Sequence, residues 1–368
     1  MLAQVPILTS FTPGSGPVGT SVTITGANFS TTPANNTVNF NGTTATVTAS
    51  TATSITTSVP TGSTTGAITV TVAGLTGTSA TNFTVPIDTT PPVVAADNTL
   101  ATIAPNSSIS VSANFTDASG IATNPAPRVF YRPIAGAAPN TFVSANMTLS
   151  TGSTYTATIP ASAVSELGVE YKYLITDGAG LDNAASQTIY KTLIDHSTGL
   201  PITSYPGSAA GAEAINYRII AIPLVLVVKT TNGVFNDVLG GYDPTIWRMF
   251  KYNGSSFTEL NASSVLTPGE GYWFITISSS PLDTGPGTTV DGSTSSPFSI
   301  TLKPGWNQIG NPYNFNISWA DIVAANPAQS ANLGGNESKI RVFRGTIENV
   351  DVLKTFEGGF VKYLGTSA

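Results

Sequence analysis

Side chains for acid–base and nucleophilic chemistry are scarce in this chain. The sequence contains one histidine, His196, and no cysteine. A Ser-His-Asp triad needs a histidine beside its nucleophile, a histidine-based metal site needs more than one, and disulfides and thiolate catalysis need cysteine. No HExxH, GxSxG or phosphate-binding glycine loop occurs in the sequence. We therefore predict that the protein is not an enzyme. We expect His196, at a junction between domains, to be solvated and inert.

Pairs of carboxylates are the remaining route to catalysis, because glycoside hydrolysis needs two acids across a sugar-binding cleft. The 20 acidic residues are scattered, and most lie next to turn residues. Glu270 and Glu357 occupy matching positions in an internal repeat described below, which favours a structural role at a turn. An unrecognised hydrolase stays as a third alternative, and it requires paired acids in a deep cleft of the C-terminal region.

Three aspartates are candidate ligands for calcium, which takes carboxylate and carbonyl oxygens clustered in loops. Asp117 lies in FTDASG, and Asp177 and Asp182 lie in TDGAGLDN. These segments are expected to meet at one end of a β-sandwich, where Asp88 from the preceding linker could join them. The alternative, which the sequence leaves open, is that these aspartates only form turns, since Asp favours such positions.

Aromatic residues of the C-terminal region are candidates for stacking on sugars. All four tryptophans lie there, and Trp247 and Trp273 are the two that we single out. Both also fall in predicted strands, where large rings usually fill the core. Core packing is the favoured interpretation of these rings, and glycan stacking stays as the alternative.

The composition indicates strands rather than helices, and it restricts the partners. Of the 368 residues, 40% are hydrophobic and only 9% are charged, where about a quarter is usual for soluble domains. Threonine suits strands because it is β-branched. The net charge is −6 and no Lys/Arg cluster occurs, so neither nucleic acid nor an anionic membrane surface is an expected partner.

Two features concern the location of the protein. The longest apolar run, Ile219 to Val228, has about half the length that spans a bilayer, and Pro223 interrupts it, so we expect no membrane insertion. The first residues, Met1 to Gln4, are similar to the end of a signal peptide, with a small residue at a cleavage-like position. We therefore expect an extracellular or cell-surface protein whose signal peptide has been removed.

The N-terminal region alternates polar and apolar residues in short runs, and Asn41-Gly42 is a strong signal for a tight turn. Its motifs are SFTPGSGPVGTSVTITGANFS from Ser10, VNFNGTTATV from Val38 and GAITVTVAG from Gly66. In this order they resemble the IPT/TIG family of immunoglobulin-like domains. That resemblance implies a non-catalytic sandwich acting as a spacer or binding module, and it transfers no functional residue.

A second region follows the stiff linker Asp88 to Pro92. Its segment LGVEYKYLITDGAG, from Leu167, resembles the end of a fibronectin type III or related bacterial immunoglobulin-like domain. The resemblance implies that Tyr171 is a corner tyrosine, whose hydroxyl ties a loop to its strand.

The C-terminal region contains an internal repeat with offsets of about 84 to 93 residues. RIIAIP parallels NQIGNP, FNDVLG parallels WADIVA, WRMF parallels IRVF, and GEGYWF parallels EGGFV. Each unit therefore predicts a strand, a short helix, a hairpin and a strand, with Ser318 and Asp321 capping the second helix. The segments DTGPGTTV and LKPGWNQIGNPYNF resemble an uncharacterised repeat module of exported bacterial surface proteins.

The sequence thus predicts an all-β protein of three domains. Residues 1–87 and 88–196 form serial immunoglobulin-like sandwiches, and residues 197–368 form a mainly β domain of two similar units with short helices. The leading functional hypothesis is an extracellular structural or adhesive protein, such as a stalk, surface layer or filament subunit, with protein subunits or cell-surface components as partners. The alternative is a carbohydrate-binding accessory region of a secreted polysaccharide-degrading protein, with polysaccharide as partner.

Overall fold

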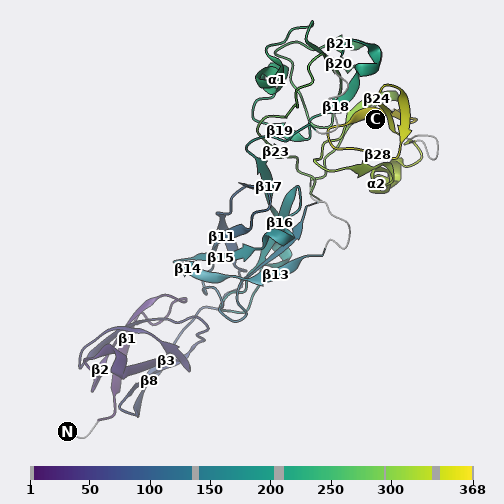
Figure 1. Cartoon of the computed structure of the whole chain (residues 1–368). Helices are drawn as coiled ribbons and strands as arrows, with labels where there is room; N and C mark the ends of the chain where they lie inside the picture. The colour runs from purple at the N-terminus through teal and green to yellow at the C-terminus, as the bar shows by residue number, and fades with distance from the viewer. Residues whose placement is uncertain (1–3, 135–140, 203–210, 294–295, 334–339, 367–368) are drawn as a thin grey trace.

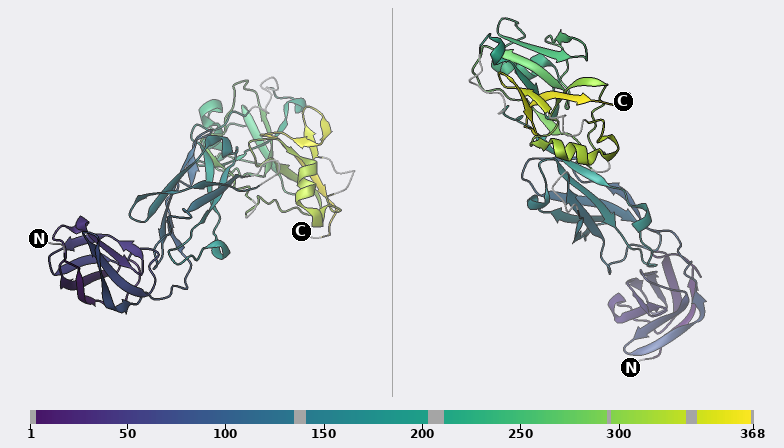
Figure 2. Two further views of the ribbon diagram at one scale, coloured as in Figure 1. Left: turned by 90° about the horizontal axis from the view of Figure 1, so that it is seen from below. Right: turned by 90° about the vertical axis from the view of Figure 1, so that its right-hand side faces the viewer.

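The computed structural model describes residues 4–134, 141–202, 211–293, 296–333 and 340–366. The chain is drawn out into three parts in a row, with the N-terminus at one end and the C-terminal third at the other (Figures 1 and 2). Antiparallel sheets dominate, and the described residues contain two α-helices, which confirms the all-β prediction. No helix among the described residues is long and apolar enough to cross a membrane.

The N-terminal part is a sandwich of two four-stranded antiparallel sheets. One sheet has the order β1 (Ile7–Thr12), β2 (Ser21–Ala27), β6 (Ser54–Ser58) and β5 (Val47–Ser50), and the other has the order β4 (Thr43–Ala45), β3 (Asn36–Phe40), β7 (Gly66–Val72) and β8 (Leu75–Phe83). Alternate residues of each strand face the core, as Val38 and Phe40 do in β3. Asn41 and Gly42 both have positive φ and turn β3 into β4, as predicted.

The middle part is a second sandwich. Its first sheet has the order β14 (Thr148–Thr151), β15 (Thr154–Ile159), β11 (Ile109–Thr116) and β9 (Val93–Asp97), and its second begins with β13 (Val143–Asn146), β12 (Arg128–Pro133), β16 (Gly168–Leu174) and β17 (Tyr190–His196), with β10 (Thr102–Ile103) pairing β17 in parallel. The Tyr171 hydroxyl was expected to tie a loop to its strand, and it contacts a side chain at the end of β9 in the other sheet. This hydroxyl donates to Asp97 Oδ2 at 2.6 Å, and Tyr173 donates to Asp97 Oδ1 at 2.9 Å, so one carboxylate of β9 joins the two sheets.

The second sandwich continues into the C-terminal region through a shared sheet. β17 pairs with β23 (Gly287–Thr289), which pairs with β19 (Leu224–Leu226). The buried Thr289 Oγ1 accepts a hydrogen bond from Ile194 N at 3.1 Å and donates one to Leu167 O at 3.1 Å. The boundary that we predicted after residue 196 therefore coincides with the end of a strand that both parts share.

His196 lies at this shared strand and not in a solvated linker. Its exposed fraction is 8%, and its Nε2 has no hydrogen-bond partner among the described residues. Burial lowers the pKa of His196 below its usual value. The expectation of a solvated histidine was wrong because the pairing of β17 with β23 joins residues about 90 positions apart, which local sequence does not reveal.

The C-terminal third contains two sheets with the same strand order, and an α-helix covers one face of each (Figure 1). The first comprises β18 (Arg218–Ala221), β22 (Gly271–Thr276), β20 (Trp247–Tyr252) and β21 (Phe257–Glu259), with helix α1 (Thr231–Leu239). The second comprises β24 (Gly305–Gly310), β29 (Gly358–Tyr363), β26 (Ile340–Phe343) and β27 (Ile347–Val350), with helix α2 (Trp319–Ala325). The short strands β25 (Ile317–Ser318) and β28 (Val352–Leu353) form a further pair. Across each sheet the strands lie in the order first, fourth, second and third, numbered by their order along that repeat unit. The two units therefore have the same topology, as the order of motifs in the sequence repeat indicates.

Helix ends follow the capping chemistry of the sequence. Ser318 Oγ accepts a hydrogen bond from Asp321 N at 3.0 Å and donates one to the Asp321 carboxylate, as predicted, and Thr230 caps α1 through Gly233 N. Single 3-10 turns complete the secondary structure at Pro33–Asn35, Ala161–Ala163, Ala184–Ser186, Ala214–Asn216 and Pro327–Gln329.

Candidate functional site

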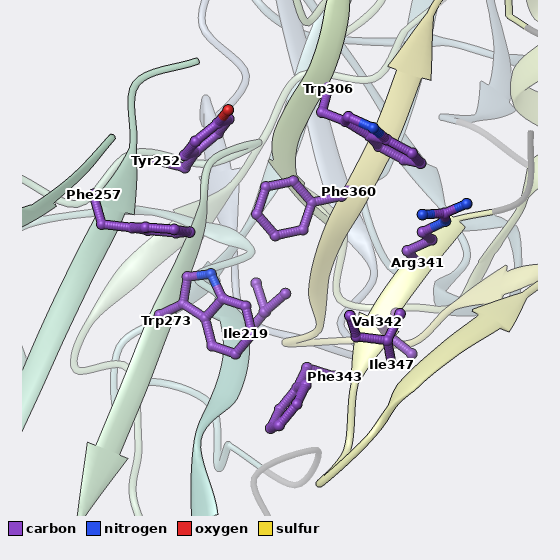
Figure 3. Close-up of a pocket in the computed structure, with 10 residues that line it drawn as sticks. All are labelled: Ile219, Tyr252, Phe257, Trp273, Trp306, Arg341, Val342, Phe343, Ile347 and Phe360. Carbon is purple, nitrogen blue, oxygen red and sulfur yellow. The ribbon is translucent and has the colours of Figure 1, made fainter. Parts of the chain in front are cut away.

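An aromatic cleft of about 280 Å³ opens between the two repeat sheets of the C-terminal third (Figure 3). Six aromatic side chains from both sheets line it: Tyr252, Phe257, Trp273, Trp306, Phe343 and Phe360. Arg341 is the charged residue among the cleft-lining residues. We call this feature the aromatic cleft.

The two-residue period of the strands decides which rings reach the cleft. In β22, Tyr272 and Phe274 are fully buried in the core beneath α1, so Trp273 between them lies on the opposite face. In β29, Val361 is buried in the core beneath α2, and the preceding Phe360 lies on the cleft side. Trp273 and Phe360 occupy equivalent positions of the sequence repeat, so duplication brings two rings to one cleft.

The rings form a connected wall. The Trp273 ring centroid lies 5.1 Å from that of Phe343, 6.2 Å from that of Phe257 and 6.4 Å from that of Phe360. Tyr252 is 5.6 Å from Phe360. Phe257 is 53% exposed, so the wall reaches the surface.

Polar groups with hydrogen-bonding capacity lie at this wall. The Trp273 indole Nε1 is buried and has no hydrogen-bond partner within the described ranges. Gln308 Oε1 accepts from Tyr252 N at 2.7 Å, whereas its Nε2 is buried and likewise unpartnered there. On the other side of the cleft the Arg341 guanidinium lies 4.3 Å from the centre of the Trp306 ring. The cleft therefore combines flat apolar faces with the donors of one guanidinium, and a lining of aromatic rings with few polar groups is typical of small-ligand sites.

The two repeat glutamates form ion pairs with residues of their own units and do not line the cleft. Glu270 pairs with Lys251 at 2.5 Å, and Glu357 pairs with Arg344 at 2.8 Å, at equivalent positions of the two units. The hydrogen bonds that Arg344 donates to the Glu357 carboxylate raise the pKa of Arg344. Neither glutamate is among the described residues that line the cleft, and no other carboxylate is.

The structure separates the two tryptophans that we singled out. Trp247 is 1% exposed and packs in the core against Phe235 and Tyr242, with ring centroids 5.6 and 4.9 Å away. Its faces are covered, so the suggestion that Trp247 stacks on a sugar does not fit its burial. Trp273 lines the cleft. The sequence reasoning missed Trp306 as a partner, although the internal repeat could have indicated that two units share one face.

The aspartates that we proposed for calcium are only partly brought together. Asp117 and Asp177 form a group with Asp88, in which one carboxylate oxygen of each lies within 4.8 Å of the others. Asp182 is outside this group, and its Oδ1 accepts a hydrogen bond from Ala184 N at 2.9 Å. Asp182 therefore forms a turn, and Asp88 from the linker is the third member of the group.

The environments of the three grouped aspartates differ. Hydrogen bonds from the Thr90 backbone and hydroxyl lower the pKa of Asp88 to about 2. Desolvation raises the pKa of Asp117, against the hydrogen bonds that it accepts from Ser119. Asp177 is 1% exposed, and its Oδ1 accepts hydrogen bonds from the backbone in its own loop.

Several solved structures have partial similarity to the chain. An auxiliary nutrient binding protein from Bacteroides ovatus is 22% identical over 27% of this chain and 24% of its own, with a TM-score of 0.23. A gamma-CGTase from alkalophilic Bacillus clarkii is 18% identical over 52% and 27% of the two chains, with a TM-score of 0.20. A structure described as being with a xylogluco-oligosaccharide is 13% identical over 78% and 59%, with a TM-score of 0.23. TM-scores of this size carry no argument about function.

The family match covers only the N-terminal part of the chain. No curated protein matches the chain. The model of the IPT/TIG domain family matches residues 6–85, which are the residues of the first sandwich. This match confirms the resemblance seen in the N-terminal motifs: residues 6–85 form an IPT/TIG domain.

Proposed function

We propose that this protein is an extracellular adhesive protein that binds polysaccharide in the aromatic cleft, with its two sandwiches acting as a spacer. The observation that carries the proposal is the cleft itself, an open site with six aromatic rings in the part of the chain farthest from the N-terminus (Figures 1 and 3). The IPT/TIG domain and the acidic, weakly charged composition support a surface protein without nucleic-acid or membrane partners.

Sugar rings suit this site for a physical reason. One face of a pyranose carries C–H groups that pack on an aromatic ring, while its edge carries hydroxyls that need donors and acceptors. Trp273 and Trp306 provide the faces, and the Arg341 guanidinium provides donors. A volume of about 280 Å³ lies near the lower end of ligand pockets, which accommodates one or two sugar units.

The open rim favours a polymer over a free monosaccharide. Phe257 and Ile347 line the cleft and are 53% and 72% exposed. A chain that leaves the cleft at either side would continue over these apolar side chains, and it would gain contact area that a single sugar lacks.

Affinity electrophoresis in gels that contain soluble polysaccharides tests the proposal. Trp306→Ala is expected to reduce retardation, with a dissociation constant about tenfold higher, since removing one stacking face costs roughly 1–1.5 kcal/mol. Phe130→Ala is the matched control, because Phe130 is a half-buried ring with an arginine over it, in the middle sandwich and away from the cleft. The proposal would be refuted if no β-glucan, α-glucan, xylan or mannan retarded the natural protein or the control.

The structural alternative, a filament or surface-layer subunit, is favoured by one edge strand. All four residues of β14 are exposed, including Leu149 at 57%, and β14 is the outer strand of its sheet. Such an edge can pair with another chain. Concentration-dependent assembly, seen by electron microscopy and abolished by Leu149→Lys, would support this role, whereas a monomer at all concentrations would exclude it.

A further inference from the structure

A small, partly open hollow of about 160 Å³ lies at the junction between the IPT/TIG domain and the middle sandwich. Pro17, Val18 and Ser63 line it from the first sandwich, and Ser119 and Gly178 line it from the second. Asp88, from the linker, lies between them. The contact is close, because the Thr61 methyl of the first sandwich packs near Gly178 of the second.

Negative charge accumulates at this junction. Asp88, Asp117 and Asp177 come from the linker and from two loops of the middle sandwich. None of the ion pairs formed among the described residues involves any of these three aspartates. Carboxylates at such separations repel one another, and burial strengthens the repulsion.

Buried oxygens without partners provide a second and independent indication of a ligand. Asp177 is 1% exposed, and its Oδ2 has no hydrogen-bond partner among the described residues. Asp88 Oδ2 is buried and unpartnered within the same ranges. Ser63, which lines the hollow from the IPT/TIG domain, is 9% exposed, and its Oγ also lacks a partner there. An unpaired buried charge is costly, so this arrangement suits a bound cation.

We propose that Asp88, Asp117 and Asp177 bind a calcium ion that fixes the IPT/TIG domain on the middle sandwich. The donors are oxygens only, and they come from separate loops. Calcium accepts six to eight oxygen ligands in flexible geometry, whereas magnesium demands a regular octahedron. Because Asp88 belongs to the linker, calcium ties the linker to the second sandwich and limits the swing of the first.

Calcium titration of the 368-residue chain, stripped with EDTA and followed by isothermal calorimetry, tests the site. We expect one ion bound with a dissociation constant on the order of 10⁻⁴–10⁻³ M, as in extracellular calcium modules. Asp88→Asn and Asp117→Asn are each expected to weaken binding about tenfold or more, because each removes one ligand charge. Asp182→Asn is the matched control and should bind as the natural protein does, since Asp182 lies outside the group.

A structural readout separates this junction site from adventitious binding. Small-angle X-ray scattering should show a narrower range of molecular lengths with calcium than with EDTA, and Asp88→Asn should remove that difference. Asp88→Asn carries the test, because Asp88 is half-buried, whereas Asp177 is 1% exposed and its replacement endangers folding. Three results would overturn the proposal: no calcium binding up to about 10 mM, equal loss of binding in Asp182→Asn, or equal affinity for magnesium. These results concern the junction, and they are independent of glycan binding in the cleft.

Discussion

The clearest prediction about stability concerns Asp97, the carboxylate that joins the two sheets of the middle sandwich. Its oxygens accept hydrogen bonds from the hydroxyls of Tyr171 and Tyr173, which are both 1% exposed. Burial and the hydrogen bond to Asp97 raise the pKa of Tyr171, so this hydroxyl remains a donor at all physiological pH values. Asp97→Ala leaves two buried hydroxyls without their acceptor.

The magnitude follows from the bonds that are lost. A hydrogen bond to a charged group contributes about 1.5–3 kcal/mol, so the two from the tyrosines amount to about 3–6 kcal/mol, and the bond that Asp97 Oδ1 accepts from Thr99 N at 3.1 Å is lost as well. Asp97 itself is only half-buried and water can replace part of the interaction, which lowers the expected loss to about 2–4 kcal/mol. Asp97→Asn retains one acceptor and should lose about half as much.

Hydrogen exchange measured on peptides from β11 and β16 detects this loss locally. Tryptophan fluorescence would not, because all four tryptophans lie in the C-terminal third and report on that region. Asp195→Ala serves as the control, since Asp195 is also a half-buried aspartate of the same sandwich. Equal protection in Asp97→Ala and Asp195→Ala would refute the reasoning. So would an Asp97→Asn variant as unstable as Asp97→Ala.

Two further predictions concern the joint between the middle sandwich and the C-terminal third. Burial lowers the pKa of His196 in the folded protein below the unfolded value of 6.5, so the unfolded chain binds protons more tightly. The free energy of unfolding should therefore fall as the pH drops from about 6.5 through the lowered pKa. Urea midpoints at a series of pH values should show this decline, and His196→Phe should flatten it; an unchanged slope in the variant would contradict the assignment. Thr289→Val removes the hydroxyl that connects Ile194 N and Leu167 O, and it should cost about 2 kcal/mol because two buried backbone groups lose a partner. Faster exchange of the Ile194 amide, compared with Thr288→Val on the same strand, would verify this effect, and equal exchange in both variants would argue against it.

Much of the fold follows from local patterns in the sequence. Alternation of polar and apolar residues defines strands such as β3, and the Asn41-Gly42 pair defines the turn that follows. The pairing of Ser318 with Asp321 at a helix start is also local. The order of motifs in the C-terminal repeat corresponds to the shared strand order of the two sheets. These features depend on backbone geometry and on neighbours within a few residues.

The candidate sites depend on contacts between distant residues, which is why they could be predicted only in part. Alternation shows that Tyr272 and Trp273 point to opposite faces of β22, but it does not show which face a helix covers. The same uncertainty applied to Trp247, which the core encloses. Asp88 and Asp182 were both plausible calcium ligands by residue type, and only the packing of the linker against the second sandwich selects Asp88.

The sequence by itself thus determined the all-β class, the IPT/TIG domain and the duplication of the C-terminal region, because a strand, a turn or a helix cap requires particular residues at short spacing. Only the tertiary structure decided that Trp273 and Phe360 share a cleft, that His196 is buried in a continuous sheet, and that three aspartates meet at a domain junction. The physical reason is that burial and proximity arise when separate sheets pack together, and this packing depends on the complementary surfaces of residues far apart in the chain.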